Sequence, residues 1–426
     1  MKDAEIERKL RWPSGSLQAL RWGFEQGYAR GQVWDLEGLP DGKNSAYTTA
    51  QRYYMRGTEV VSQVPVDYVF SDEPDSRFHQ LLKTSFVVCD GNVYRLWHHL
   101  LEGQVHHVLD EPQESKKTLA CVAEILDCAS QFPENPWLII GGGITCDLAA
   151  FAASLVKQLF VLVPTSLLAM VDASVGGKTG VNFPPFGKNM VGSFAFPQTV
   201  LIYTQWLRTL PPEEFYAGGV EALKHAFLQP KRDFLVGLQE VLINRDPFPL
   251  AFWIPKILHV KIDIVSRDLS EKGASAVLNL GHTTAHALEA QAMNAQTAAP
   301  LSHGMAVGLG LVFESFLSCA LGYRSPFAHK ELVRILQNAH GLRSRSWWET
   351  QLGACLETNS EKLCHHMFRD KKKQIPSDRI PFVLLAKNGE TVRTNRNSWV
   401  VHVPAHDVHQ MWKIFCASNT EINGLR

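Results

Sequence analysis

The segment LIIGGGITCDLAAFAASLVKQLFVLVP, residues 138–164, most constrains the fold of this chain. Two short apolar runs flank a stretch with helical spacing, and three glycines join the first run to that stretch. Short β-branched runs that end at Gly or Pro are typical of buried parallel strands, which need a crossover helix between them. An earlier run, SFVVCD, precedes a second helical pattern, KKTLACVAEILDCASQF. This alternation predicts an α/β domain with a parallel sheet over residues 46–208.

Strand-like runs nearly vanish after about residue 211. The segment PPEEFYAGGVEALKHAF begins with prolines and two acidic residues, as helices often do. Further helices are expected at residues 232–244, 251–268, 282–293, 303–322 and 328–340. We therefore predict a mostly helical second domain over residues 209–426. Residues 1–45 are polar and are interpreted as an N-terminal extension of unknown role.

The charge balance excludes some classes of partner. Lys plus Arg and Asp plus Glu number 42 each, so the net charge indicates neither nucleic acid nor an anionic membrane as a partner. The sequence has no run of about 18 apolar residues, and its start has no apolar signal-peptide core. We therefore expect a cytoplasmic protein without a membrane partner, in which any cationic site is local.

Glycines and lysines predict anion sites. The glycines at residues 141–143 let backbone amides approach a phosphate at a helix start, although a tight turn without a ligand gives the same sequence. Asp147 could accept a hydrogen bond from a ribose or an amide, and a solvated aspartate in the first helical turn is the alternative. Lys178 in GGKTGVN and Lys188 in GKNMVG, with Asn189 beside it, lie in glycine-flanked sequence without other charges. A phosphate explains this pairing better than a solvated surface does. Other candidate cations are Lys224, Lys261 and the RDKKK cluster at residues 369–373, a solvated loop being the alternative for that cluster.

Histidines and one carboxylate predict a metal site. His282 and His286 are four residues apart in NLGHTTAHALEA, which places both on one helix face. His303 begins a further helix in SHGMAV, and Glu221 lies in GGVEALKH. Two His and one carboxylate with an open position form the pattern of a catalytic zinc site. Because the chain has 17 His, ordinary surface or core histidines are the alternative.

Residues 85–390 resemble the dehydroquinate synthase family, a branch of the sugar phosphate cyclases. The motifs VVCDGNV, ESKKT, GGGITCD, PTSLLAMVDASVGGKTGVN, GKNMVG, LNLGH and RDKKK carry the resemblance in family order, with Gln113 in place of a glycine. The resemblance implies NAD contacts at Asp90, Asn92, Glu114, Lys117, Gly142, Gly143, Asp147, Thr165 and Asp172. It implies catalytic and substrate roles for Lys178, Lys188, Asn189, Lys224, Lys261, His286 and Lys372. It implies a zinc or cobalt ion at Glu221, His282 and His303.

The resemblance also implies a reaction. In that family NAD oxidises a hydroxyl of a seven-carbon sugar phosphate, the metal polarises the new carbonyl, and phosphate is eliminated. NADH then restores the hydroxyl, and an intramolecular aldol step closes the carbocycle. The expected protein is a 3-dehydroquinate synthase-type lyase of the shikimate pathway, hence of aromatic amino acid biosynthesis. It would have a Rossmann-like NAD-binding domain, a sugar phosphate as substrate and a homodimeric assembly.

Three departures from the family leave the substrate open. Ser275 stands where the family has an arginine that holds the substrate carboxylate. LVKQLF replaces the family's YxRG, so the arginine of that motif is absent, and Lys157 could replace it only as a point charge. Whether the family's dimer contact through residues 155–160 is kept is therefore left open. Met305 replaces a polar residue in HGM. The alternatives are a sedoheptulose 7-phosphate cyclase (2-epi-5-epi-valiolone synthase-like), a non-catalytic protein that binds NAD and metal, and a metal-dependent alcohol dehydrogenase of similar architecture.

Overall fold

In the computed structural model, the chain forms two compact units. The described residues are 47–56, 59–101, 103–183, 187–229, 232–245, 247–268, 273–294, 301–339, 360–369, 378–387, 389–394 and 398–422. The first unit ends at Pro211 and also includes Asp246–Ile262, while the second comprises Pro212–Arg245 and the residues from Asp263 onward. The predicted N-terminal extension lies outside the described residues, so nothing tests its role.

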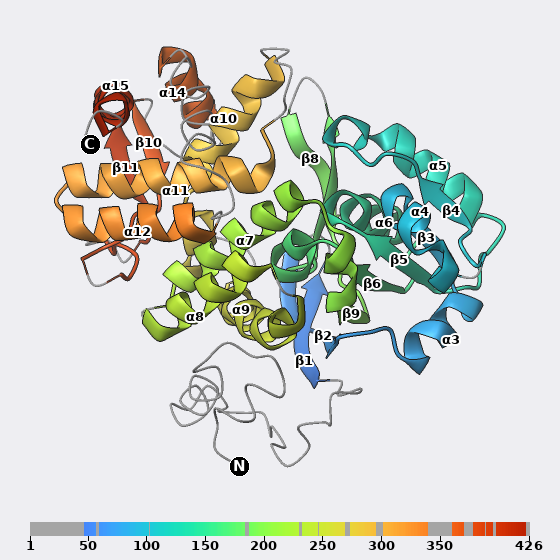
Figure 1. Ribbon diagram of the computed structural model, residues 1–426. Helices are drawn as coiled ribbons and strands as arrows, with labels where there is room; N and C mark the ends of the chain where they lie inside the picture. The colour runs from blue at the N-terminus through green and yellow to red at the C-terminus, as the bar shows by residue number, and fades with distance from the viewer. Residues whose placement is uncertain are drawn as a thin grey trace, which may run out of the picture. The chain divides into compact units, whose positions relative to one another are not determined.

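Seven strands form the main sheet of the first unit, in the order β1-β2-β9-β6-β5-β3-β4 (Figure 1). Their bounds are β1 Tyr47–Arg56, β2 Glu59–Ser71, β3 Phe86–Asp90, β4 His107–Leu109, β5 Trp137–Gly141, β6 Phe160–Pro164 and β9 Thr199–Tyr203. β1 pairs with β2 in the antiparallel direction, and all other neighbours in the sheet are parallel. The predicted α/β fold with a parallel sheet is confirmed.

Helices connect the parallel strands, and the sequence pattern predicted the second and third of the three given next, but not the first. α4 (Gly91–Leu101), α5 (Leu119–Ala129) and α6 (Gly143–Leu155) follow β3, β4 and β5 in turn. Strands β3, β5 and β6 are buried at every residue, which explains why their sequences are continuous apolar runs rather than alternating ones. The shorter elements of this unit are α3 Ser76–Thr84, η2 Glu114–Lys116, η3 Ala169–Ala173 and η4 Thr204–Thr209.

A two-stranded hairpin carries both glycine-flanked lysines. β7 (Lys178–Phe183) pairs with β8 (Gly187–Phe194) in the antiparallel direction. The sequence analysis did not predict these strands, because glycines interrupt the alternation of apolar residues that identifies a strand. The glycines allow close pairing: a Cβ at Gly180 would lie 2.8 Å from the carbonyl oxygen of Val191.

The second unit is mostly helical, as predicted. Its elements are α7 Pro212–Phe227, α8 Arg232–Asn244, η5 Ala274–Asn279, α10 His282–Asn294, α11 His303–Ala320, α12 Pro326–Ala339, α14 Ser360–Arg369, β10 Arg379–Phe382, β11 Val401–Pro404 and α15 Ala405–Ile422. The long helix α9 (Pro247–Arg267) passes from the first unit into the second. Every helix predicted in this half is present. The small β10–β11 pair was not predicted.

The helix α11 is the centre of the second unit's core. It packs against α10, α7, α12 and α15, and its residues from Gly304 to Ser315 are all buried. Among the described residues, it alone is long and apolar enough to span a membrane, but 78% of its most apolar window is buried inside the protein. Its apolar sequence is therefore that of a core helix.

Candidate active site

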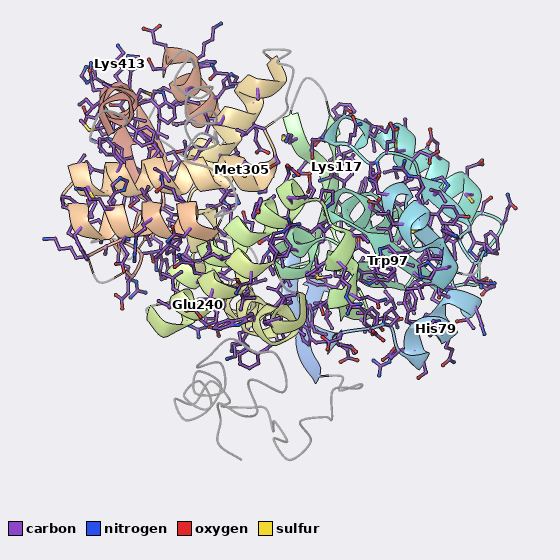
Figure 2. The ribbon with its side chains drawn as sticks, in the orientation of Figure 1. His79, Trp97, Lys117, Glu240, Met305 and Lys413 are labelled. Atoms are coloured by element: carbon purple, nitrogen blue, oxygen red, sulfur yellow. The ribbon has the colours of Figure 1, made fainter. Side chains whose placement is uncertain are left out.

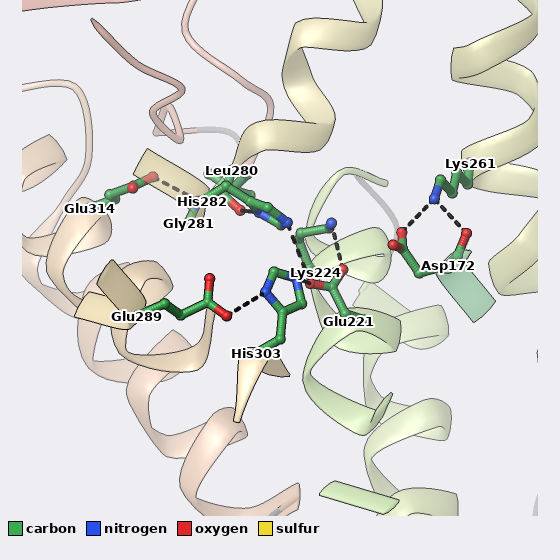
Figure 3. Close-up of polar contacts among 10 residues, drawn as sticks. All are labelled: Asp172, Glu221, Lys224, Lys261, Leu280, Gly281, His282, Glu289, His303 and Glu314. Atoms are coloured by element: carbon green, nitrogen blue, oxygen red, sulfur yellow. Dashed lines mark hydrogen bonds and ion pairs between the residues drawn. The ribbon is translucent and has the colours of Figure 1, made fainter. Parts of the chain in front are cut away.

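Three helices of the second unit bring the predicted metal ligands together (Figure 3). Glu221 lies on α7 and is fully buried, while His282 and His303 are the first residues of α10 and α11. The Oε1 atom of Glu221 lies 3.7 Å from the Nε2 atom of each histidine. One ligand atom from each of the three residues lies within 4.8 Å of the others. This spacing suits three ligands around one small cation.

Hydrogen bonds at the far side of each ring orient the two histidines. The Nδ1 atom of His282 lies 3.1 Å from the carbonyl oxygen of Leu280, and Nδ1 of His303 lies 3.3 Å from Oε1 of the buried Glu289. Because these oxygens accept, each Nδ1 carries the proton, and each Nε2 keeps its lone pair for the site. Metal-bound histidines typically have such an outer partner.

Burial keeps His282 in the form that a metal needs. Burial lowers its pKa well below the usual histidine value, and the positive charge of Lys224 and the neighbouring His303 and His286 lower it further. A neutral imidazole at physiological pH is the ligand form of histidine.

The buried carboxylate of Glu221 also fits a cation. Neither of its oxygens has a hydrogen-bond partner among the described residues, although the Nζ atom of Lys224 forms an ion pair with Oε2 at 2.5 Å. Oε1 instead faces the two imidazole nitrogens. A buried carboxylate oxygen without a donor is costly, and a divalent ion between Glu221, His282 and His303 would remove that cost. The side chain of His303 is 33% exposed, which leaves one side of the site open to a further ligand.

His286 lies beside the three candidate ligands. Its ring centroid is 5.4 Å from that of His282 and 6.2 Å from that of His303. The four-residue spacing on α10 therefore places both histidines of that helix at the same site, as the sequence predicted.

A buried lysine bonds to two other predicted site residues of the first unit. Lys117, labelled in Figure 2, is 4% exposed, and its Nζ atom lies 2.5 Å from Oδ2 of Asp147 and 2.6 Å from Oδ1 of Asn189. Burial raises the pKa of Asp147, while the charge of Lys117 opposes that rise. From the sequence, Lys117 and Asp147 are expected at the cofactor and Asn189 at the substrate. The network ties these residues into one cluster.

The glycine turn lies where β5 enters α6. Gly142 is the N-cap residue of α6 and Gly143 its first residue, so the backbone amides of the first turn are available to an anion. The buried Asp90 supports this turn from the end of β3: its Oδ2 accepts from the Thr145 hydroxyl at 3.2 Å, and its Oδ1 accepts from the amide of Asn92 at 2.9 Å. Burial raises the pKa of Asp90, and these hydrogen bonds oppose the rise. In this structure the Asp90 carboxylate therefore positions the turn.

Two further predicted residues of the first unit, Lys261 and Asp172, form an ion pair. The Nζ atom of Lys261, on α9, lies 2.8 Å from Oδ1 and 2.6 Å from the carbonyl oxygen of Asp172. Asp172 belongs to a single turn of π-helix, an irregularity that is frequent at functional sites. Thr165 follows β6 and is buried, and its amide donates to the carbonyl oxygen of Gly141 at 3.0 Å.

The two glycine-flanked lysines occupy different ends of the β7–β8 hairpin. Lys178 pairs with Phe194 at the far end of β8 and is exposed. Lys188 lies near the turn, and its Nζ atom is 4.0 Å from Oε1 of Glu114. The strand geometry alone does not place the two ammonium groups side by side.

Asn182, which was not predicted from the sequence, holds this hairpin to the segment of Glu114. Its Nδ2 donates to Oε1 of Glu114 at 2.8 Å, and its Oδ1 accepts from the amide of Asn189 at 2.9 Å. Asn189 has a positive φ of 52°, so its unusual backbone is fixed by this bond. Asn182 lies within GGKTGVN, and the motif itself was the available signal.

The structure also shows the surroundings of the residues that depart from the family pattern. Ser275 is buried, and its hydroxyl donates to Oδ2 of Asp268 at 2.8 Å. Lys157 is exposed with a positive φ of 58°, just after α6. Met305 is buried in the first turn of α11 (Figure 2). Lys372, the predicted lysine of the RDKKK cluster, lies outside the described residues.

Together, the fold and the site define a class: an α/β protein with a parallel sheet, followed by a helical unit that holds a candidate Glu–His–His metal centre. Residues 107–217 match the family model described as 3-dehydroquinate synthase N-terminal, and residues 218–373 match the one described as 3-dehydroquinate synthase C-terminal. The chain belongs to the dehydroquinate synthase family, as its motifs predicted.

Curated relatives support this membership. The chain is 37% identical over 287 residues to the 3-dehydroquinate synthase of Campylobacter concisus, a match that covers 66% of this chain and 77% of the relative. It is 35% identical over 315 residues to that of Pseudomonas aeruginosa PAO1, a match that covers 73% of this chain and 76% of the relative.

Two solved structures share the fold. A 2-deoxy-scyllo-inosose synthase complexed with carbaglucose-6-phosphate, NAD+ and Co2+ superposes with a TM-score of 0.70 at 20% identity, over 86% of this chain and 99% of that one. The 2-epi-5-epi-valiolone synthase of Streptomyces hygroscopicus with NAD+ and Zn2+ gives a TM-score of 0.63 at 21% identity, over 79% and 91%.

Proposed function

We propose that this chain is an NAD- and metal-dependent sugar phosphate cyclase of the 3-dehydroquinate synthase type. Its reaction would be the oxidation, phosphate elimination, re-reduction and aldol cyclisation of a seven-carbon sugar phosphate. The observation that carries the proposal is the arrangement of Glu221, His282 and His303 around one point in a chain of this family. A homodimeric assembly and a cytoplasmic location remain predictions.

Each cofactor has candidate residues in the chain. When bound, NAD supplies the hydride acceptor and donor, and the metal ion supplies a Lewis acid. The glycine turn at Gly142 and Gly143 offers backbone amides to the dinucleotide, and Glu221, His282 and His303 offer ligands of a kind that suits zinc or cobalt.

The lysines of the chain would act on negative charge. Lys224 is buried beside Glu221, so its ammonium would stabilise an oxyanion that develops near the metal site. Lys178 and Lys188 would attract the phosphate of the substrate, and His286 lies close enough to the metal site to bind the sugar. Lys261 would contact the substrate, and Asp172, which would lie near NAD, would orient its ammonium group.

A phosphate-release assay with two substrates tests the proposal. Purified protein with NAD and Zn2+ is incubated separately with the heptulosonate phosphate and with sedoheptulose 7-phosphate. Release from the first substrate is the expected result. Failure to release phosphate from either, by protein that binds both NAD and metal, would instead identify a non-catalytic homologue.

Ser275 supports a second candidate, a sedoheptulose 7-phosphate cyclase. The serine is buried and bonded to Asp268, so this position offers no cation to a substrate carboxylate. Loss of a cation that pairs a carboxylate typically costs about 2–5 kcal/mol of binding. Phosphate release from sedoheptulose 7-phosphate alone would favour this candidate.

A further inference from the structure

A buried carboxylate on α11 caps the helix that begins with a candidate metal ligand. Glu314 is 1% exposed. Its Oε2 accepts from the amide of Gly281 at 2.7 Å, and its Oε1 accepts from both the amide and the hydroxyl of Thr284 at 3.1 Å. Figure 3 shows Glu314 reaching the chain at Gly281. These bonds bracket His282, the first residue of α10.

The contact has the chemistry of a helix cap supplied from a distant element. The first amides of a helix have no partner within it, and the positive end of the helix dipole favours a negative charge there. Glu314 satisfies two of these backbone donors with one carboxylate. A buried carboxylate is costly unless it is paired in this way, so the interaction needs both the charge and its geometry.

Backbone packing holds Glu314 in reach of this helix start. Gly310 lies one turn before Glu314 on α11, and a Cβ at Gly310 would overlap the carbonyl oxygen of Gly281. Gly281 itself has a positive φ of 80°, which favours glycine. The turn before His282 is therefore fixed by α11 at two places one helical turn apart, through backbone contact at Gly310 and through the carboxylate of Glu314.

We propose that Glu314 is a positioning residue for the metal centre. It fixes the first turn of α10, so that Nε2 of His282 is already aimed at the ion before binding. The same helix α11 supplies His303 as its first residue, so α11 provides one ligand directly and orients another. The proposal rests on the proposed metal site at Glu221, His282 and His303.

Three substitutions and a matched control test this role. In Glu314→Gln the shape is kept, but the amide group must turn a donor toward a backbone N–H. Glu314→Ala removes the cap, and Thr284→Val removes only the hydroxyl contact. Ser318→Ala is the control, because Ser318 is buried one turn later on α11 and donates to Leu385 instead of α10.

Zinc affinity, measured by competition with a chromophoric chelator, is the primary readout. We expect Glu314→Gln and Glu314→Ala to weaken zinc binding roughly 10- to 100-fold, as loss of outer partners of metal ligands typically does. Thr284→Val should weaken it a few-fold, and Ser318→Ala should leave it unchanged. The absorption spectrum of bound Co2+ should shift in both Glu314 variants, since the geometry of a ligand changes.

The outcomes separate this role from a merely structural one. If both Glu314 variants and Thr284→Val melt at lower temperature yet bind zinc as tightly as the wild type, the positioning role is wrong. If Glu314→Ala does not fold, the zinc affinities of Glu314→Gln and Thr284→Val decide whether Glu314 positions the metal site. If wild-type protein binds no zinc, the proposed metal site itself fails, and the positioning role fails with it.

Discussion

The protonation state of His282 follows from its surroundings. Burial and the adjacent Lys224 lower its pKa, and the Leu280 carbonyl selects the tautomer that leaves Nε2 unprotonated. His286, one turn later on the same helix, lies beside the site without belonging to the three residues whose ligand atoms converge. The geometry thus groups His282, but not His286, with the candidate metal ligands, a distinction that the four-residue spacing alone cannot make.

Replacing each histidine separately tests that assignment. His282→Ala removes a ligand, so we expect zinc affinity to fall at least 100-fold, because one of three protein ligands is lost. His286→Ala should retain stoichiometric zinc but lose phosphate-release activity. Metal content after gel filtration, measured by mass spectrometry, distinguishes the two. Equal zinc loss in both variants would contradict the assignment.

At the level of residues, the sequence predicted side chains that carry charge or ligate metal, but not those that orient them. Glu221, His282 and His303 were identifiable because their residue types and family motifs point to a metal site. Glu289 and Glu314 were not, since a helical glutamate has the same sequence appearance in solvent as in a buried cap. Their roles depend on which helix lies opposite, which only the tertiary structure gives.

Helix contacts in the second unit depend on glycines where backbones meet. A Cβ at Gly310 would meet the backbone of Gly281, which cannot move as a flexible side chain can. A Cβ at Gly219 on α7 would meet only the side chain of Leu242, at 3.4 Å or more. The two helical glycines therefore form a matched pair for substitution.

We expect Gly310→Ala to destabilise the protein by about 1–3 kcal/mol, because the helices must separate. Gly219→Ala should be neutral or stabilising, since alanine favours a helix by about 1 kcal/mol over glycine. Thermal unfolding of metal-free protein measures both effects. A melting temperature for Gly310→Ala equal to that of the wild type would show that α10 and α11 do not pack as described.

The start of α12 carries a histidine that titrates far from its usual range. Burial, with Arg324 and Lys330 as minor causes, lowers the pKa of His329 to about 4, and its Nδ1 lies 3.1 Å from the Ser315 hydroxyl. The unfolded chain protonates near pH 6.5, so it binds more protons than the folded protein between these values. The stability that neutral His329 provides is present above pH 6.5 and is lost as the pH falls toward 4.

Urea unfolding at pH 7.5 and pH 5.0 tests this effect. Wild-type protein should lose about 1–2 kcal/mol more stability across this interval than His329→Gln, with the lower figure allowing for partial exposure of the ring. Identical losses in the two proteins would show that His329 is protonated in the folded state at pH 5.

At the level of elements, long periodic helices and buried strands were predictable, and short or glycine-rich elements were not. β5 and β6 are continuous apolar runs because both faces of the sheet are covered. The β7–β8 hairpin has no such pattern, since its glycines serve close strand pairing, and β10 is too short to stand out among helices.

At the level of the whole molecule, each unit contains its own cluster of candidate site residues. The first holds the glycine turn at Gly142 and the bonded group of Lys117, Asp147 and Asn189, and the second holds the candidate metal ligands. The order of these motifs along the chain, together with the family match, is why the proposed function could be predicted from sequence. The choice of substrate could not, because it depends on replaced residues such as Ser275.

If Glu221, His282 and His303 hold one divalent ion, as proposed, sugar phosphate cyclisation requires that ion. The most direct test of this requirement is phosphate release by metal-stripped protein, in the presence of NAD and both sugar phosphates, as Zn2+ is added stepwise. We expect no release without metal and a rise that stops at one zinc ion per chain. Release that does not depend on zinc, or none at any zinc concentration, would contradict it.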